Sequence, residues 1–139
     1  MLDKANQNIV RELKENSRQS VRDIAKKTNL RPSTVHLRMN KMLEDGIIEK
    51  FTLKLNNQRV GENFIVFILL NSEKDIPNTF FKDKRIKEVF GITGENDLLI
   101  KCKFKDVEDF NDFILTFRKI PGVKKTITMV ATTTIKEEL

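Results

Sequence analysis

The sequence has little of the residues that most often carry catalysis, metal binding or cross-links. Its 139 residues include one cysteine, Cys102, and one histidine, His36. One cysteine cannot form an internal disulfide, and the pair cannot supply a Cys/His metal cluster. His36 lies in a basic stretch far from Cys102, which argues against a histidine-activated nucleophile. We predict no metal, no cofactor and no enzymatic activity, although carboxylate-only chemistry stays open.

Long hydrophobic runs are also lacking. The longest covers residues 64–70, far short of the roughly 20 residues that a membrane-spanning helix needs. Asp3, Lys4 and Asn6 interrupt the start of the chain, so no apolar signal segment is expected there. Hydrophobic residues make up 39% and charged residues 33%, which is typical of a soluble chain with compact cores. We predict a cytoplasmic protein with no membrane partner.

The net positive charge is confined to one part of the chain. Residues 1–60 contain 13 Lys and Arg against 7 Asp and Glu, whereas residues 61–139 contain 13 of each. The net charge of +6 therefore belongs to the first part alone. Such asymmetry favours a nucleic-acid or membrane-surface partner for the basic part, with a basic solvated surface as the alternative.

The basic part has the pattern of three helices. Apolar residues recur at helical spacing over residues 4–15, and Asp3 is suited to cap that helix. Ser20 opens a second, short helix that ends near Asn29. A third helix is predicted from Pro32 to Asp45, and Gly46 ends it. The second and third helices, joined by a short turn, form a helix-turn-helix pattern over residues 21–40.

The third helix has two distinct faces. Val35, Met39, Met42 and Leu43 fall on one stripe and are expected to pack on the other helices. Its opposite side is polar, as expected of a helix whose first turns approach base edges in the major groove. We expect base contacts from the first half of this helix, above all from Arg38 and Asn40, and phosphate contacts from the basic residues. The candidate DNA-binding residues are Arg22, Lys26, Lys27, Arg31, Ser33, Thr34, His36, Leu37, Arg38, Asn40 and Lys41. The alternative is a three-helix domain that only docks proteins.

A strand is predicted directly after the third helix. Phe51, Leu53 and Leu55 alternate with polar residues, as in a wing or a linker strand. Residues 56–58 then read as a hinge. These observations divide the chain into a DNA-binding domain with its hinge strand, residues 2–63, and a second domain, residues 64–139.

The second domain has the order strand, helix, strand, strand, helix, strand. The strands are predicted at 64–70, 86–93, 98–104 and 123–135, and the helices at 76–84 and from Asp106 to Phe117. Cys102 falls on the apolar side of its strand and is most simply a core residue. This order is that of a ferredoxin-like βαββαβ domain, so the predicted fold class is α+β.

Both helices of such a domain cover one face of the sheet. The other face needs a cover, and a second copy of the chain is the economical one. We therefore predict a homodimer, which also suits a helix-turn-helix that reads two half-sites.

Short motifs along nearly the full length resemble the Lrp/AsnC (leucine-responsive, feast/famine) transcriptional regulators. Their order and spacing carry the resemblance, rather than any single motif. The matching residues are Leu2, Asp3, Ile24, Ala25, Leu30, Ser33 to Val35, Arg38, Leu43, Gly46 to Ile48, Gly61, Gly91 to Gly94, Asp97 and Pro121 to Val123.

The resemblance implies a sequence-specific DNA-binding regulator of double-stranded DNA with a winged-type helix-turn-helix. It also implies dimers that build octamers or related assemblies, and an amino-acid or other small effector bound near a glycine–aspartate loop. The effector candidates on this sequence are Gly94, Glu95, Asn96 and Asp97, with Thr132, Thr133 and Thr134 as a second set. Backbone amides of such a loop can hold a carboxylate, and Asp97 an ammonium group. An ordinary hairpin turn is the alternative for Gly94 to Asp97. The alternative for the chain is a small-molecule-binding module with a protein-docking helical domain.

Overall fold

The computed structural model describes residues 2–138 and divides them into two compact units, between Leu53 and Lys54. Each unit has its own hydrophobic core and is described by itself. The sequence boundary after residue 63 differs from this division. Residues 54–63 lie with the second unit because Lys54 and Asn57 bind Glu137 near the end of the chain.

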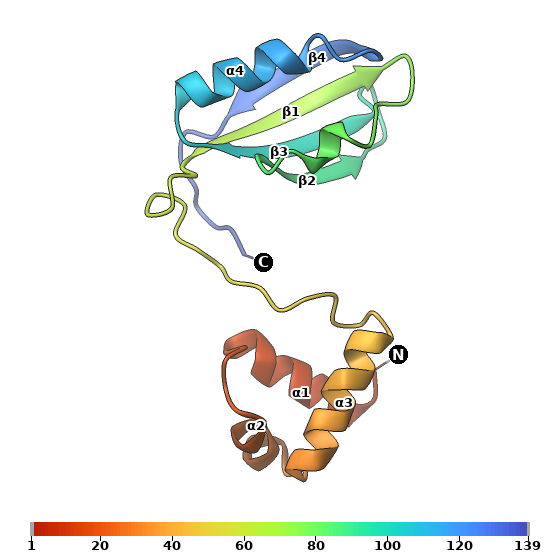
Figure 1. Cartoon of the computed structure of the whole chain (residues 1–139), viewed down its shortest axis with the longest axis vertical. Coiled ribbons are helices and arrows are strands. Elements are labelled where there is room, and N and C mark those ends of the chain that lie inside the picture. The colour runs from red at the N-terminus through yellow and green to blue at the C-terminus, as the bar shows by residue number, and fades with distance from the viewer. Residues whose placement is uncertain (1, 139) are drawn as a thin grey trace. The chain divides into compact units, whose positions relative to one another are not determined.

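The first unit consists of the three predicted helices, α1 (Lys4–Glu15), α2 (Val21–Thr28) and α3 (Pro32–Glu44) (Figure 1). Its core side chains come from all three helices, and Ile9, Ile24, Val35 and Met42 are fully buried. The helical spacing of these residues is therefore what brings the helices together.

Local signals begin and end the helices near the residues that the sequence predicts. The Asp3 carboxylate accepts a hydrogen bond from the Asn6 amide at 2.8 Å, and the Ser20 hydroxyl accepts one from the Asp23 amide at 3.1 Å. Asn29 ends α2 in the left-handed conformation, with φ of 55°. Gly46, with φ of 69°, follows the end of α3 in the left-handed conformation.

Two expectations for the region after α2 are wrong. Leu43 was expected to pack inward, but it lies at the edge of the core stripe and is 38% exposed. Residues 51–55 were expected to form a strand, but among the described residues none pairs with them. Phe51, Leu53 and Leu55 are 49%, 65% and 52% exposed. Alternation alone does not make a strand, since the backbone also needs a neighbour for hydrogen bonding.

The second unit has the predicted ferredoxin-like strand order. Its sheet runs β2-β3-β1-β4, and all neighbouring strands are antiparallel (Figure 1). The elements are β1 (Phe64–Ser72), η1 (Phe80–Lys82), β2 (Ile86–Gly91), β3 (Leu98–Phe104), α4 (Val107–Phe117) and β4 (Val123–Val130). The predicted α+β class and βαββαβ strand order are therefore confirmed, with two local differences.

The first difference is the helix predicted over residues 76–84, which is only the 3-10 turn η1. Pro77 disfavours helical backbone before it, and Asn78 and Thr79 favour turns. Aromatic packing holds this short turn on α4. The centroid of the Phe80 ring lies 5.0 Å from the ring centroid of Phe117 and 5.9 Å from that of Phe113.

The second difference is the last strand, predicted to reach Ile135 but ending at Val130. The Ala131 amide still donates to the Ile65 carbonyl at 2.9 Å. Beyond that bond β1 offers little more backbone, because it begins at Phe64. The threonines that follow therefore have no strand to pair with, whatever their β propensity.

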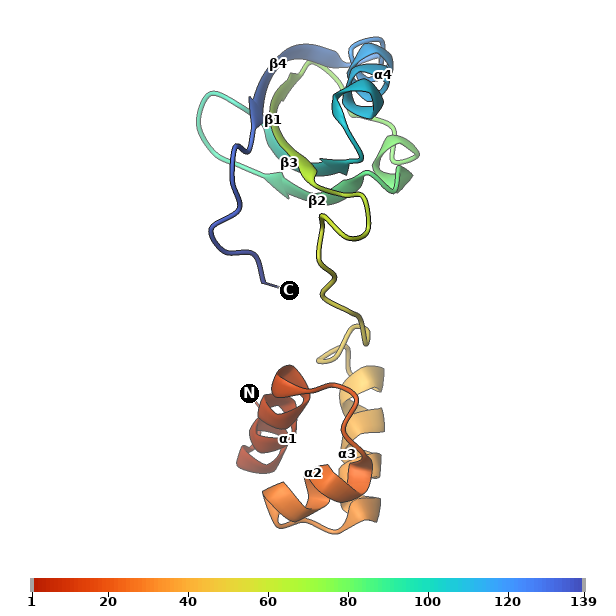
Figure 2. The same cartoon turned by 90° about the vertical axis from the view of Figure 1, so that its left-hand side faces the viewer.

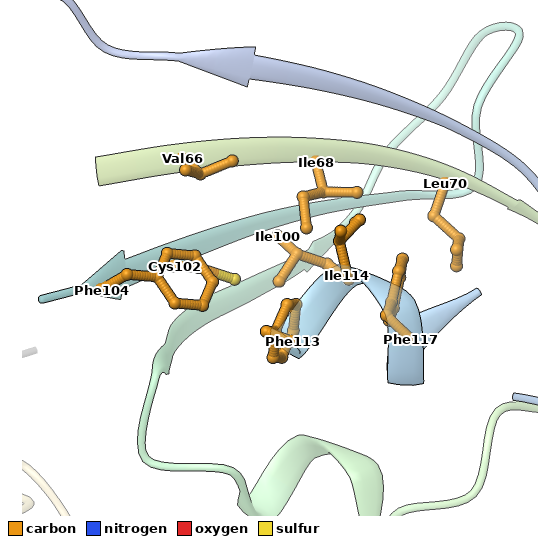
Figure 3. Close-up of a cluster of buried hydrophobic side chains, with 9 residues drawn as sticks. All are labelled: Val66, Ile68, Leu70, Ile100, Cys102, Phe104, Phe113, Ile114 and Phe117. Atoms are coloured by element: carbon orange, nitrogen blue, oxygen red, sulfur yellow. The ribbon is translucent and has the colours of Figure 1, made fainter. Parts of the chain in front are cut away.

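One face of the sheet and α4 enclose the core of the second unit (Figure 3). Val66, Ile68, Ile100 and Cys102 point from β1 and β3 toward Phe113 and its neighbours on α4. Cys102 is fully buried, which confirms its assignment to the core. Burial raises the pKa of its thiol to about 12, so the reactive thiolate is suppressed.

The opposite face of the sheet, which we call the open face, carries no helix in the described part of the chain (Figure 2). Its apolar residues alternate with the core residues along the strands. They are Ile65, Phe67, Leu69, Phe90, Leu99, Ile127 and Met129. Phe90, Ile127 and Met129 are 52%, 40% and 43% exposed. No described helix is long and apolar enough to span a membrane.

Candidate functional site

The first half of α3 presents a polar surface opposite its buried side. Val35 and Met42 are fully buried, whereas the residues around the other side are open to solvent. The predicted division of the helix into two faces is therefore found, apart from Leu43. The exposed candidates are Ser33, His36, Leu37, Asn40 and Lys41, and Thr34 and Arg38 are half-buried at the flanks.

Short-range contacts order this surface. The Asn40 side-chain nitrogen lies 3.2 Å from Nε2 of His36, one turn earlier. The Lys41 ammonium lies 2.9 Å from the Asp45 carboxylate, and that hydrogen bond raises the pKa of Lys41. Lys41 is therefore fully cationic at neutral pH, and Asn40 still has free donor and acceptor capacity for a ligand.

Arg38 is held within the domain. Its Nη1 atom donates to the Asp3 carboxylate at 2.7 Å and to the Asn6 side-chain oxygen at 3.0 Å. The Asn6 amide and the Arg38 guanidinium together hold the pKa of Asp3 below its usual value. Arg38 thus fastens α3 to the start of α1, and a base contact from Nη1 would compete with these bonds.

Lys27 is likewise engaged inside the domain. Its ammonium lies 3.2 Å from a carboxylate oxygen of Glu12, which is 9% exposed, and donates to the Gln19 side-chain oxygen at 3.0 Å. The other predicted phosphate contacts, Arg22, Lys26 and Arg31, are exposed. Among the described ion pairs none includes those three side chains.

Gly94 to Asp97 lies in the loop that joins β2 to β3. Gly94 has φ of 110°, a conformation that other residues rarely adopt. The Asp97 carboxylate accepts from the Ser72 amide at 2.9 Å, and the Asp97 amide donates to the Leu70 carbonyl at 2.9 Å. These bonds fasten the loop to the end of β1. Glu95 is exposed and Asn96 is half-buried.

Thr132, Thr133 and Thr134 lie at the other end of β1, because they follow the bond from Ala131 to Ile65. All three are exposed. Thr134 lines a hollow of about 430 Å³ between residues 54–58 and the C-terminal segment. The two predicted effector sets are therefore not brought together within one chain.

A group of partly buried charges lies at this hollow, and sequence reasoning missed it. We call it the Glu137 cluster. The Glu137 carboxylate accepts from Lys103 at 2.7 Å and from the Asn57 amide group at 3.2 Å, forms an ion pair with Lys101 at 3.1 Å, and also binds the Lys54 ammonium. Burial by itself would raise the pKa of Glu137, but the bonds from Lys103, Lys54, Lys101 and Asn57 hold it well below its usual value.

The cluster ties three separate segments together: the end of the chain, residues 54–57 and β3. The only sequence signal was the alternation of Lys101 and Lys103 with core residues on one strand. Nothing in the spacing of these lysines pointed to the carboxylate of Glu137, which lies 34 residues after Lys103.

Comparisons with known proteins agree with this arrangement of two units. Residues 2–49 match the family described as winged helix-turn-helix DNA-binding, and residues 74–139 match the Lrp/AsnC ligand binding domain. An HTH-type transcriptional regulator from Pyrococcus abyssi is 37% identical, and the match covers 99% of this chain and 97% of that protein. The chain belongs to the Lrp/AsnC family. It is a helix-turn-helix transcriptional regulator with a ligand-binding domain, as the sequence resemblance implied.

A further relative and two solved structures are also similar to this chain. The HTH-type transcriptional regulator FL11 from Pyrococcus abyssi is 34% identical over 98% of this chain and 93% of its own length. A transcriptional regulator from Neisseria meningitidis, solved in complex with L-Met, superposes with a TM-score of 0.88 at 25% identity, covering 99% of this chain and 94% of that one. The fold is also that of Escherichia coli AsnC, with a TM-score of 0.88 at 20% identity and coverage of 100% and 97%.

Proposed function

We propose that α3 enters the major groove of a double-stranded operator, with Ser33, Thr34, His36, Leu37 and Asn40 toward the bases. The supporting observation is the exposed polar face in the first half of α3, opposite the buried Val35 and Met42. A helix fits the major groove, and a bidentate asparagine side chain suits the edge of adenine. We assign Arg38 chiefly to fastening α3, because Asp3 and Asn6 already bind it.

Phosphate contacts are proposed for Arg22, Lys26, Arg31 and Lys41. The first three are exposed and enter no ion pair among the described residues, so they can neutralise phosphates without breaking a bond. Lys27 would have to break its ion pair with Glu12 and its hydrogen bond to Gln19 before it could contact a phosphate. Counterion release from these contacts makes the affinity fall steeply with salt.

The test is selection of preferred sites from randomised duplexes, followed by binding measurements over a salt series. Asn40→Ala is expected to lose preference for the selected site. Asn111→Ala, an exposed asparagine on α4, is the matched control and keeps it. Binding without preference over random DNA contradicts the proposal, as does an affinity that does not respond to salt.

We also propose that the second unit binds a small effector, an amino acid in the first instance. The match to a ligand-binding domain and the L-Met complex of the Neisseria meningitidis regulator support this. The candidates remain Gly94 to Asp97 and Thr132 to Thr134, which one chain keeps at opposite ends of β1. A thermal-shift screen of the twenty amino acids tests it, since a ligand of the folded state raises the melting temperature. If none of the twenty raises the melting temperature, the result favours a regulator without an amino-acid effector.

A homodimer through the open face, able to build octamers, is proposed as the assembled form. Phe90, Ile127 and Met129 are 40% to 52% exposed there, which is a large apolar area for one small unit. A second copy would cover it, and would present the helix-turn-helix twice to a pseudo-palindromic operator. Sedimentation velocity tests this, and a monomer at micromolar concentration contradicts it.

We place the protein in the cytoplasm and expect no enzymatic activity. The support for both is membership of a family of DNA-binding transcriptional regulators.

A further inference from the structure

Leu37 is an unusual residue at the centre of the candidate base-reading surface. It is 71% exposed, against 38% for Leu43 at the edge of the core stripe. A helix turns about 100° per residue, so Leu37 lies about 200° around α3 from the buried Val35. It therefore points almost directly away from the core of the domain.

The neighbours of Leu37 are polar. Ser33 lies one turn before it, and Asn40 and Lys41 lie one turn after it, and all three are exposed. Single exposed leucines are common on protein surfaces and by themselves mean little. Here, however, the leucine lies in the middle of the exposed polar face that we propose meets the bases, where side chains able to form hydrogen bonds would be expected.

The floor of the major groove offers one apolar group, the C5-methyl of thymine. The exposed edges of guanine, adenine and cytosine carry donors and acceptors that a leucine would remove from water without replacing their hydrogen bonds. Leu37 would therefore favour thymine and disfavour the other bases at the position it covers.

We propose that Leu37 is a specificity-determining residue that contacts the methyl group of one thymine in each operator half-site. This inference rests on the proposed DNA-binding role of α3 and adds to it the identity of one base. The two half-sites come from the proposed dimer, and the inference does not depend on the effector or on any larger assembly.

The experiment begins with a preferred site selected by the wild-type protein. Each thymine of that site is then replaced in turn by deoxyuridine, which removes only the methyl group. At one thymine per half-site, this change should weaken binding about fourfold, the effect of withdrawing one methyl-sized group from apolar contact. Cytosine at that position should bind worse, and 5-methylcytosine should recover part of the loss.

Leu37→Ala should bind the thymine and deoxyuridine sites equally and should select sites with no preference at that position. Leu115→Ala is the matched control, because Leu115 is also an exposed helix leucine, 57% exposed on α4. It should keep the wild-type difference between the two bases. Circular dichroism and sedimentation of Leu37→Ala should be unchanged.

Three results overturn the inference. Wild-type protein that selects a site but tolerates deoxyuridine at every thymine has no methyl contact. An equal deoxyuridine effect in Leu37→Ala assigns the contact to another residue, and an altered sedimentation of Leu37→Ala assigns Leu37 to a protein contact. Failure to select any site is a different result, because it overturns the proposed function itself.

Discussion

Replacing Glu137 with glutamine tests whether the Glu137 cluster stabilises the second unit. The change keeps the size of the side chain and one acceptor oxygen but removes the negative charge between Lys54, Lys101 and Lys103. The side chains of Lys101 and Lys103 are only 14% and 11% exposed, and that of Glu137 is 11% exposed. The variant would therefore leave two largely buried ammonium groups without a counter-charge.

The magnitude follows from these contacts. Removing one partner of a buried ion pair costs about 3–5 kcal/mol, and a hydrogen bond to a charged group contributes about 1.5–3 kcal/mol. Lysine side chains can relax by turning their ends toward water, and the side chain of Lys54, 40% exposed, loses little. We expect Glu137→Gln to lower the free energy of unfolding of the second unit by about 2–3 kcal/mol.

The matched control is Glu138→Gln, one residue further on. The Glu138 side chain is 74% exposed, and its ion pair is with Lys136, itself 75% exposed. Exposed pairs contribute little, so this variant should change stability by less than about 0.5 kcal/mol. The chain has no Trp and no Tyr, so urea unfolding is best followed by circular dichroism. Hydrogen exchange of peptides from β3 assigns the change to the second unit.

The pH dependence gives an independent check. The pKa of Glu137 lies below its ordinary value of 4.5 in the folded protein, so the folded state binds fewer protons than the unfolded chain. The stability from Glu137 is thus fully present above about pH 4.5 and is lost as the pH falls toward the lower, folded pKa. The difference between wild type and Glu137→Gln should be constant near neutrality and shrink in acid. A loss as small as that of Glu138→Gln, or one independent of pH, would refute the reasoning.

Three further predictions concern other parts of the molecule. Arg38→Ala and Asp3→Ala should each destabilise the first unit, and a double-mutant cycle in urea unfolding should show that their effects are coupled; additive effects would show that the contact at 2.7 Å contributes nothing. Gly122→Ala should lower unfolding stability by about 1–3 kcal/mol, because Gly122 has φ of 100° and an added Cβ would lie 3.0 Å from the Lys74 carbonyl oxygen; an unchanged midpoint would contradict this. Met129→Lys, on the open face, should shift the protein toward monomer in sedimentation velocity without loss of helicity, and an unchanged dimer would exclude this face as the interface.

The helix-turn-helix was predictable because its determinants are local. The caps at Asp3 and Ser20, the left-handed Asn29 and the ending at Gly46 each act within one turn of helix. The helical spacing of the buried residues likewise shows which faces must meet. Sequence reasoning therefore found all three helices and the polar face of α3.

The predictions that failed depended on a partner elsewhere in the chain. The alternation of residues 51–55 is that of a strand, but a strand also needs a neighbouring backbone, and none of the described residues supplies one. Residues beyond Val130 have strand propensity, but β1 gives them nothing to pair with. Leu43 fell on the edge of the apolar stripe and is 38% exposed.

The sequence by itself determined the two-part organisation, the basic helix-turn-helix and the order of the sheet strands, because periodicity, caps and charge are written in neighbouring residues. Only the tertiary structure decided which of the charged side chains pair with one another. Arg38 and Lys27, which the sequence predicts as DNA contacts, form ion pairs with Asp3 and Glu12, and Glu137, which looks like a solvated tail residue, joins three lysines. Ion pairs between distant segments form only after the backbone has brought them together, so no spacing along the chain could reveal them.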